Sequence, residues 1–245
     1  MALFTDGPVS TIEDLTGQDS QILDVASTES IDLGRKLALA QEEVGVELSL
    51  ALDRADAGRN TGNVVVTPAL KLWHTFRTLE MTYRDAYYSQ LNDRYAGKRD
   101  AFGGMAKWAY EKLIQGGIGI ATDPAPQAAT PRVETAPGNL PSGTYYVTAA
   151  WVNAAGEEGV CATPAVVTGA GSTLRVRAVQ APANATGWNV YVGDSGETLT
   201  QQNGGPIPAS QSWTQPNPVT NTGRAPGGGQ RANYLLKAIR RIQRG

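Results

Sequence analysis

The sequence predicts an α+β protein whose helices and strands lie in separate domains. Of its 14 prolines, two lie in residues 1–122 and twelve in residues 123–245. Helix interiors reject proline, whereas turns and strand edges accept it. Apolar residues recur every three or four positions in the first half and alternate in the second half, as in helices and strands respectively. With 41% apolar and 18% charged residues, the chain can form packed cores.

The first half, residues 1–122, predicts a bundle of four helices. Their expected ranges are 10–27, about 30–57, 68–95 and 98–115. Ser10 and Glu13 fit a capping box for the first helix, and Thr67 followed by Pro68 is a strong start for the third.

Aromatic residues at helical spacing are expected to form the core of this bundle. They are Trp73, Phe76, Tyr83, Tyr87 and Trp108, and Met105 is expected to join them. His74 lies off the main stripe and is expected at the surface or at the edge of the core.

The second half predicts an antiparallel β-sandwich over residues 132–225, reached through an extended Pro/Ala linker at 123–131. About seven short strands are expected, including 144–152, 160–167, 174–179, 188–192, 197–201 and 210–214. Cys161, in one of these strands, is expected to be a small core residue.

The last twenty residues, 226–245, predict a flexible glycine linker followed by a basic amphipathic helix. Leu235, Ala238, Ile239 and Ile242 fall on one helical face, and the remaining positions carry Arg231, Lys237, Arg240, Arg241 and Arg244. Because so short a helix is marginal alone in water, we expect a docking arm that folds onto a partner.

Charge is unevenly distributed along the chain. The formal net charge is −2, but residues 1–60 carry −8 and the last twenty residues carry +5. The near-neutral total gives no reason to expect a nucleic-acid or membrane binder. The first eight residues lack the pattern of a signal peptide, and no apolar run approaches the length of a membrane span, so we expect a cytosol-like compartment.

The sequence shows no catalytic constellation. Its single Cys161 and single His74 exclude an intrachain disulfide and a Cys/His zinc site. Gly103-Gly104 and Gly227-Gly228-Gly229 are not followed by the residues of a phosphate loop. We therefore expect no enzyme activity, no metal and no cofactor.

Two resemblances point to a viral structural protein. Residues 140–148, 152–159 and 185–192 look like a fibronectin type III or Ig-like module of the kind found in structural proteins of tailed bacteriophages. Residues 11–15, 31–33, 36–44 and 83–95 resemble the head–tail adaptor, or connector, proteins of tailed phages. The resemblance implies a helical bundle that forms a ring, typically of twelve copies, beneath the portal, here with an inserted β module.

The resemblance implies a virion protein of the phage neck that is made in the host cytoplasm, with no membrane partner. Its expected partners are the portal protein, the tail or next neck protein, further copies of itself, and passing DNA that it does not bind specifically. The C-terminal arm is expected to grip the portal, through Tyr234, Leu235, Lys237, Ile239, Arg240, Arg241, Ile242 and Arg244.

The long second helix suggests further contacts. Val46 and Leu50 widen its apolar arc beyond one face, so we expect them in the interface between ring subunits. Acidic residues, Glu42, Glu43, Glu47 and Asp53, are expected either to line the DNA channel, where they would repel phosphates, or to form an ordinary solvated face.

Two alternatives remain open from the residues alone. The chain could be a binding module of a tail or surface protein, with the β-sandwich contacting a host glycan or a decoration partner. An exposed Trp151, Trp188 or Trp213 would favour that function. A virion-associated wall hydrolase is the third alternative, and the missing catalytic residues disfavour it.

Overall fold

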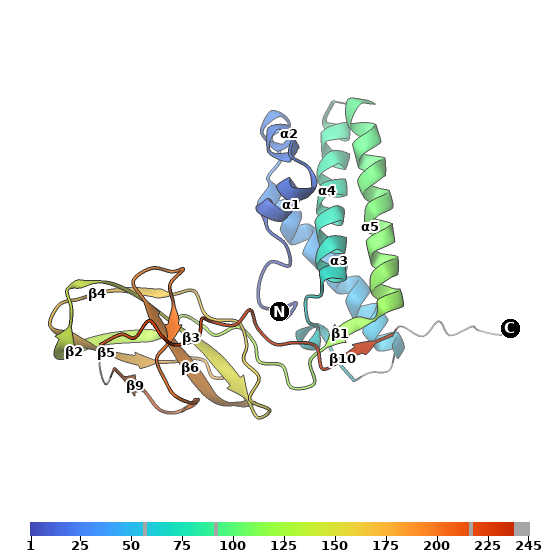
Figure 1. Ribbon diagram of the computed structural model, residues 1–245. Coiled ribbons are helices and arrows are strands. Elements are labelled where there is room, and N and C mark those ends of the chain that lie inside the picture. The colour runs from blue at the N-terminus through green and yellow to red at the C-terminus, as the bar shows by residue number, and fades with distance from the viewer. Residues whose placement is uncertain (56–57, 91–92, 216–217, 238–245) are drawn as a thin grey trace. The chain divides into compact units, whose positions relative to one another are not determined.

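A computed structural model describes residues 1–55, 58–90, 93–215 and 218–237 of the chain (Figure 1). The chain divides into two compact units. The β unit comprises Met1–Asp6 and Ala121–Arg231, and the helical unit comprises Gly7–Ile120 and the chain from Ala232 onward. Helices precede antiparallel sheets, which confirms the predicted α+β class.

The helical unit is built around one central helix, α4. Its helices are α1 (Ile12–Gln18), α2 (Ile22–Thr28), α3 (Leu33–Ala55), α4 (Pro68–Gln90) and α5 (Ala96–Gly116), with short 3₁₀ turns at Thr61–Asn63 and Asp93–Tyr95. Helix α4 packs most extensively against α5, then against α3, and also contacts α1 and α2. Thr67 caps α4 as expected, since its hydroxyl accepts a bond from the Leu70 amide at 3.4 Å.

The predicted helix over residues 10–27 is two helices. Its cap is Thr11 paired with Asp14, and not Ser10 paired with Glu13. Ser10 is instead fully buried, with its hydroxyl bonded to His74. Helix α1 ends at Gln18 because the carboxylate of Asp19 accepts the Gln21 amide at 3.1 Å and starts a new turn there.

The helical unit also contains a small sheet that joins its two chain segments. Strand β1 (Ile118–Ile120) pairs antiparallel with β10 (Tyr234–Leu236), and Ile120 faces Tyr234 in the register. The Asn233 amide extends this pairing by donating to the Ile120 carbonyl at 2.8 Å.

This pairing corrects the predicted C-terminal helix. Tyr234 and Leu235 lie in a strand, and Lys237 directly follows it without helical structure. An isolated short helix is marginal, whereas the edge of β1 offers backbone partners at once. The other expected docking residues, Ile239, Arg240, Arg241, Ile242 and Arg244, lie outside the described residues.

The β unit contains two antiparallel sheets. Its strands are β2 (Arg132–Leu140), β3 (Gly143–Asn153), β4 (Ala165–Gly169), β5 (Ser172–Arg177), β6 (Ala185–Gly193), β7 (Thr200–Gln201), β8 (Ile207–Pro208) and β9 (Trp213–Thr214). One sheet has the order β2-β5-β9, and the other has the order β4-β3-β6-β7 with β8 paired to β6. Both sheets contribute to one core, which contains Leu174 and Trp213 from the first sheet and Trp151 and Trp188 from the second.

The segments expected to be free linkers are packed parts of the β unit. Ala125 and Ala128 are buried, and the Ala128 amide donates to the Val160 carbonyl at 3.2 Å. On the return path, Gln230 is 3% exposed and accepts the Ala125 amide at 2.9 Å. Its own amide donates to the Asp123 carbonyl at 3.0 Å. The outgoing and returning chain segments therefore bind each other within this unit.

Candidate functional site

One hollow on the helical unit is a groove whose walls are α3 and α5 and whose floor is α4. It encloses about 580 Å³. Its lining residues are Glu43, Val44, Val46, Glu47, Trp73, Arg77, Glu80, Gly103, Ala106, Lys107 and Tyr110. We call it the α3–α5 groove.

An ion cluster crosses the floor of this groove. Arg77 of α4 donates from Nη2 to Glu43 of α3 at 2.6 Å and from Nη1 to Glu80 of its own helix at 2.7 Å. Burial alone would lower the pKa of Arg77, but the two carboxylates hold this pKa above its ordinary value. The cluster therefore joins α3 to α4 and balances the charge of Arg77 with two carboxylates.

Apolar side chains complete the floor. The rings of Trp73 and Tyr110 pack with centroids 4.9 Å apart at 54°, and so join α4 to α5. Glu47 on one wall and Lys107 on the other have no ion pair or side-chain hydrogen bond among the described residues. The groove therefore combines an internally paired ion cluster and aromatic side chains on its floor with an unpaired Glu47 and an unpaired Lys107 on its walls, among the described residues.

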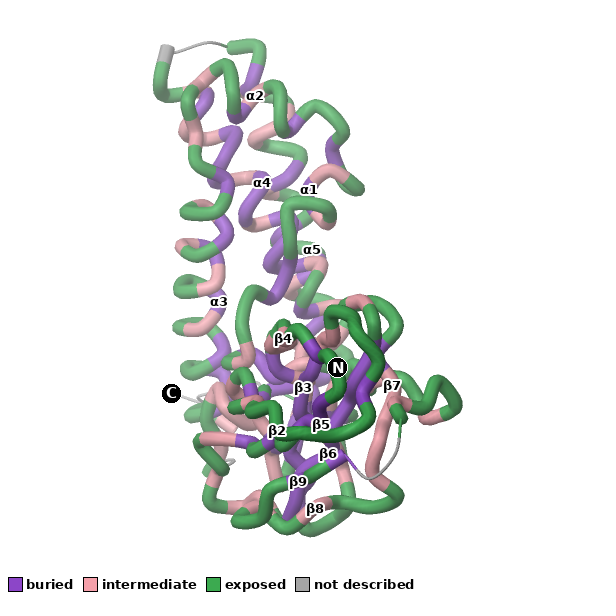
Figure 2. Tube along the Cα trace, turned by 90° about the vertical axis from the view of Figure 1, so that its left-hand side faces the viewer, coloured by how far each residue is buried: buried purple, intermediate pink, exposed green. Residues whose placement is uncertain are grey.

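Residues of α3 that the sequence singled out as functional candidates lie at or near the α3 wall of the groove. Val46 is 61% exposed and lines the groove with Glu47. Leu50, 43% exposed, lies one turn beyond Val46 on the same flank of α3. Glu42 precedes Val46 by four residues and Asp53 follows it by seven, so helical spacing places both acids on the same exposed side of α3 as Val46, although neither lines the groove. Figure 2 shows buried and exposed residues alternating along α3.

Helix α5 carries a second exposed apolar flank that sequence reasoning missed. Trp108 is 50% exposed and Met105 is 45% exposed, so both expectations of a core position were wrong. The helix buries only the narrow stripe of Phe102, Ala106, Ala109 and Leu113 against its neighbours. Ala106 and Ala109 are the sequence signal that could have identified this stripe, because small residues allow two helices to pack closely. By helical spacing, Met105 and Trp108 lie on the flank of α5 that turns away from the groove.

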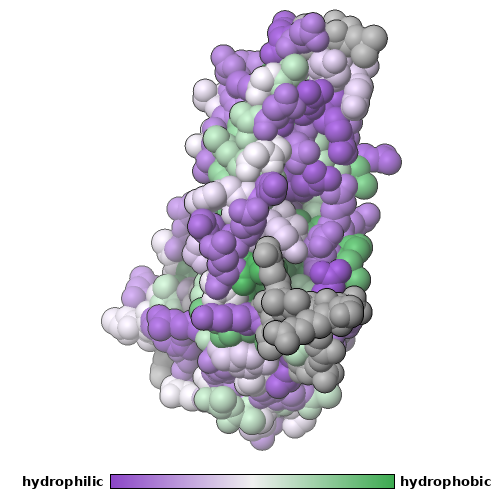
Figure 3. Space-filling model, turned by 90° about the vertical axis from the view of Figure 1, so that its right-hand side faces the viewer, coloured by the Kyte–Doolittle hydropathy of each residue, from purple (hydrophilic) through white to green (hydrophobic). Residues whose placement is uncertain are grey.

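Lys112 follows Trp108 by one turn on that flank. In Figure 3 the surface is largely hydrophilic, with hydrophobic side chains in separate small patches.

A polar cluster joins the turn between α1 and α2 to helices α4 and α5. Lys98 of α5 and the hydroxyl of Tyr83 on α4 both donate to the Asp19 carboxylate, at 2.7 and 2.5 Å. Burial alone would raise the pKa of Asp19, but these bonds outweigh it and hold the pKa below its usual range. The carboxylate is held as an acceptor and has no free position for proton transfer.

His74 is fully buried, contrary to the expected surface or edge position. Its Nε2 lies 3.0 Å from the Leu37 carbonyl, which can only accept, so this nitrogen carries the proton. Nδ1 then accepts from the Ser10 hydroxyl at 2.5 Å. Burial lowers the pKa of the imidazole, so the ring is a neutral cross-link between α3, α4 and the start of the unit.

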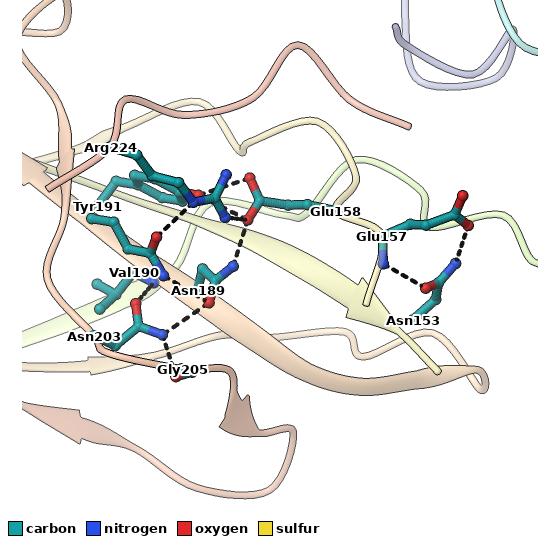
Figure 4. A network of polar contacts seen from close by, with 10 residues as sticks. Asn153, Glu157, Glu158, Asn189, Val190, Tyr191, Asn203, Gly205 and Arg224 are labelled. Carbon is teal, nitrogen blue, oxygen red and sulfur yellow. Dashed lines mark hydrogen bonds and ion pairs between the residues drawn. The ribbon is translucent and has the colours of Figure 1, made fainter. Parts of the chain in front are cut away.

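Figure 4 shows a second polar network, in the β unit. The Glu158 carboxylate, whose side chain is 10% exposed, accepts from the Tyr191 hydroxyl at 2.7 Å and from Arg224 at 2.6 Å. Asn189 adds a third donor at 2.5 Å. Burial, with help from this carboxylate, raises the pKa of Tyr191. Since every donor meets the same anion, the network anchors the returning chain at Arg224 to strand β6.

The tryptophans that would favour glycan stacking are inside the β unit. Trp151, Trp188 and Trp213 are 1%, 0% and 8% exposed. None of them presents a ring face to solvent, so stacking on these residues does not support a glycan-binding function.

Cys161 is only partly buried, at the edge of a small cluster around Tyr191. Burial raises the pKa of its thiol to about 12, so the sulfur stays protonated near neutral pH.

Among the described residues, no group of three or more His, Cys, Asp or Glu side chains could hold a metal ion. No described helix combines the length and apolar character needed to cross a bilayer.

No protein-family model matches the chain, and neither the curated proteins nor the solved structures contain a significant match. Function must therefore be argued from the surfaces of the two units.

Proposed function

We propose that the chain is a structural subunit of the head-to-tail adaptor ring of a tailed phage, with the helical unit forming the ring. The observation that carries this proposal is the pair of exposed apolar flanks, Val46 with Leu50 on α3 and Met105 with Trp108 on α5. A closed ring of identical subunits needs two different surfaces on each copy, because the contact runs head to tail.

The charges on the two flanks are complementary. The α3 flank carries Glu43 and Glu47, and the α5 flank carries Lys112 beside Trp108. Glu43 is already paired with Arg77, whereas Glu47 has no ion pair or side-chain hydrogen bond among the described residues and is available to a neighbour. We therefore pair Glu47 of one copy with Lys112 of the next, around a contact of Val46 and Leu50 with Met105 and Trp108.

In this proposal the helical unit also joins the portal to the tail and faces the DNA path. Tyr234 and Leu235 are 38% and 55% exposed beside strand β1, so they can begin a portal contact that continues into residues 237–245. Glu42 and Asp53 are exposed on the same side of α3 as Val46 and Leu50, so at the edge of the ring contact they could repel passing phosphates. The β unit would be an Ig- or fibronectin-III-like module on this ring, which its two antiparallel sheets and shared core support.

The ring is tested by size, measured by light scattering on the purified full chain with and without portal protein. The double variant Val46→Asp, Leu50→Asp should stay monomeric while its far-ultraviolet circular dichroism remains helical, since both residues are exposed. The control is Leu23→Asp, because Leu23 is an exposed apolar residue on α2 whose exposed fraction lies between those of Leu50 and Val46. Rings that form normally in the double variant would contradict the proposed interface.

Charge reversal tests the pairing itself. Glu47→Lys alone should weaken assembly through like charges at the contact, and adding Lys112→Glu should restore it. Weakening in both the single and the double reversal would show that these residues do not face each other.

The structure also determines where the portal test must cut the chain. Because β10 pairs with β1, truncation before Tyr234 would remove part of the helical unit's sheet. Truncation after Lys237 keeps this sheet and should still abolish portal binding. Unchanged affinity would place the portal contact elsewhere.

A further inference from the structure

We propose that the outer face of the β2-β5-β9 sheet binds an acidic oligosaccharide, that is, a sugar chain bearing carboxylate or phosphate groups. This arginine face is defined by Arg132 and Glu134 on β2, Arg175 and Arg177 on β5, and Thr214 on β9. The inference is independent of the proposed ring, since it concerns the β unit alone.

Strand alternation and register bring these side chains together. Leu174 and Val176 of β5 point into the core, so Arg175 and Arg177 point outward, and both are exposed. Arg132 lies directly opposite Arg177 in the register, and Glu134 lies directly opposite Arg175. The guanidinium groups of Arg132, Arg175 and Arg177 therefore belong to two neighbouring cross-strand pairs on the same face of the sheet.

The local electrostatics are unfavourable without a ligand. Arg132 and Arg177 are like charges on opposed positions, which destabilises a sheet. The single acid, Glu134, bonds Arg132 with an Oε1–Nε distance of 3.1 Å. Arg175 and Arg177 have neither an ion pair nor a hydrogen bond from their side chains within the described part of the chain. The guanidinium groups of Arg175 and Arg177 thus remain available to bind an anion.

The charge is local and does not cover the whole unit. Residues 1–6 and 121–231 contain five arginines, no lysine and seven acidic residues, a net charge of −2. Three of those arginines lie on this face, and Arg224 is paired with Glu158. A small positive spot on an acidic unit suits a few acidic groups, whereas a DNA duplex needs a broad basic surface.

The chemistry of the adjoining hollow favours a sugar. It encloses about 710 Å³, and Arg175 and Arg177 line it together with hydroxyl and amide side chains, Thr173, Ser210, Gln211 and Thr214. Hydroxyls and amides match the hydroxyls of a sugar, and arginine forks match carboxylate or phosphate oxygens. The described lining contains no aromatic residue. Recognition therefore depends on the acidic groups and not on stacking against a sugar ring or a base.

The test is calorimetric titration of the full chain with two probes, an oligogalacturonate for carboxylates and a phosphomannan oligosaccharide for phosphates. We expect at least one probe to bind, with an affinity that falls as salt rises. The double variant Arg175→Gln, Arg177→Gln should bind it about tenfold more weakly or not at all, since charge-assisted bonds are lost. The variant should remain folded, because both side chains point to solvent and one like-charge pair is removed.

The matched control is Arg35→Gln, Arg54→Gln, which makes the same charge change at exposed positions of the helical unit. This control should bind like the natural chain. The proposal is overturned if neither probe binds, if the control is weakened equally, or if a DNA duplex binds more tightly at the same arginines. Repeating the titration on the Val46→Asp, Leu50→Asp variant separates this outcome from any failure of ring assembly.

Discussion

Acidification from pH 7.5 to pH 5.5 should destabilise the helical unit through a single residue, His74. The ring is fully buried and its pKa is lowered by burial, against which the hydrogen bond to Leu37 and the charge of Asp14 both act in the raising direction. In the unfolded chain the imidazole titrates near its ordinary value of about 6.5. Below that pH the unfolded state binds a proton that the native state refuses, so stability falls as the pH falls.

The size of the effect follows from one proton. Each pH unit below about 6.5 costs at most about 1.4 kcal/mol while the native ring stays neutral. Integrated from pH 7.5 to pH 5.5, the loss reaches up to about 1.4 kcal/mol. Nε2 donates to Leu37 and Nδ1 accepts from Ser10, so protonation of Nδ1 would also require the Ser10 hydroxyl to change from donor to acceptor.

The assay is urea unfolding at several pH values, followed by circular dichroism at 222 nm, which reports the helices. His74→Gln is the control, since it removes the only imidazole and should flatten the slope between pH 7.5 and 5.5. Each protein is compared with itself across pH, so an overall loss of stability in the variant does not obscure the slope. The single histidine also permits direct NMR titration of its ring protons. Equal slopes in both proteins, or a ring that titrates near 6.5 in the native state, would refute the reasoning.

Three further predictions concern packing and reactivity. Asp19→Asn should cost about 1–3 kcal/mol in urea unfolding, below the value for a fully buried pair because Lys98 is 38% exposed; no change would show that the cluster is not stabilising. Cys161 should react slowly with a thiol reagent at pH 8 and completely after unfolding, since its thiol pKa is raised to about 12; rapid native labelling would contradict this. Gly159→Ala should destabilise the β unit by about 1–3 kcal/mol, because the new Cβ would lie 2.4 Å from the Ala125 carbonyl oxygen. A neutral effect in thermal unfolding would show that residues 123–131 are not packed there.

Much of the candidate ring surface could be predicted because it depends on one helix. The positions of Val46 and Glu47 on the exposed side of α3 follow from helical spacing once the buried stripe is recognised. The second flank could not be predicted in the same way, since an aromatic residue such as Trp108 usually indicates a core. The exposure of Trp108 depends on how closely α5 approaches α4. The periodicity of apolar residues within α5 does not specify that distance.

The sequence by itself determined the division into a helical and a β half, the extent of α3 and the start of α4. These features depend on proline placement, periodicity and the local cap at Thr67, all of which act within a few residues. Tertiary structure decided the features that join distant segments. The burial of His74 needs Ser10, 64 positions away, and the anchored path of residues 123–131 needs Gln230.

The C-terminal segment shows the physical reason most directly. Its apolar spacing is compatible with a helix, but β1 presents unpaired backbone groups, and pairing makes Tyr234–Leu236 a strand. The arginine face likewise exists only because the register sets Arg132 opposite Arg177. Local patterns specify which conformations a segment can adopt at low cost, whereas the partner that satisfies its backbone and side chains selects among them.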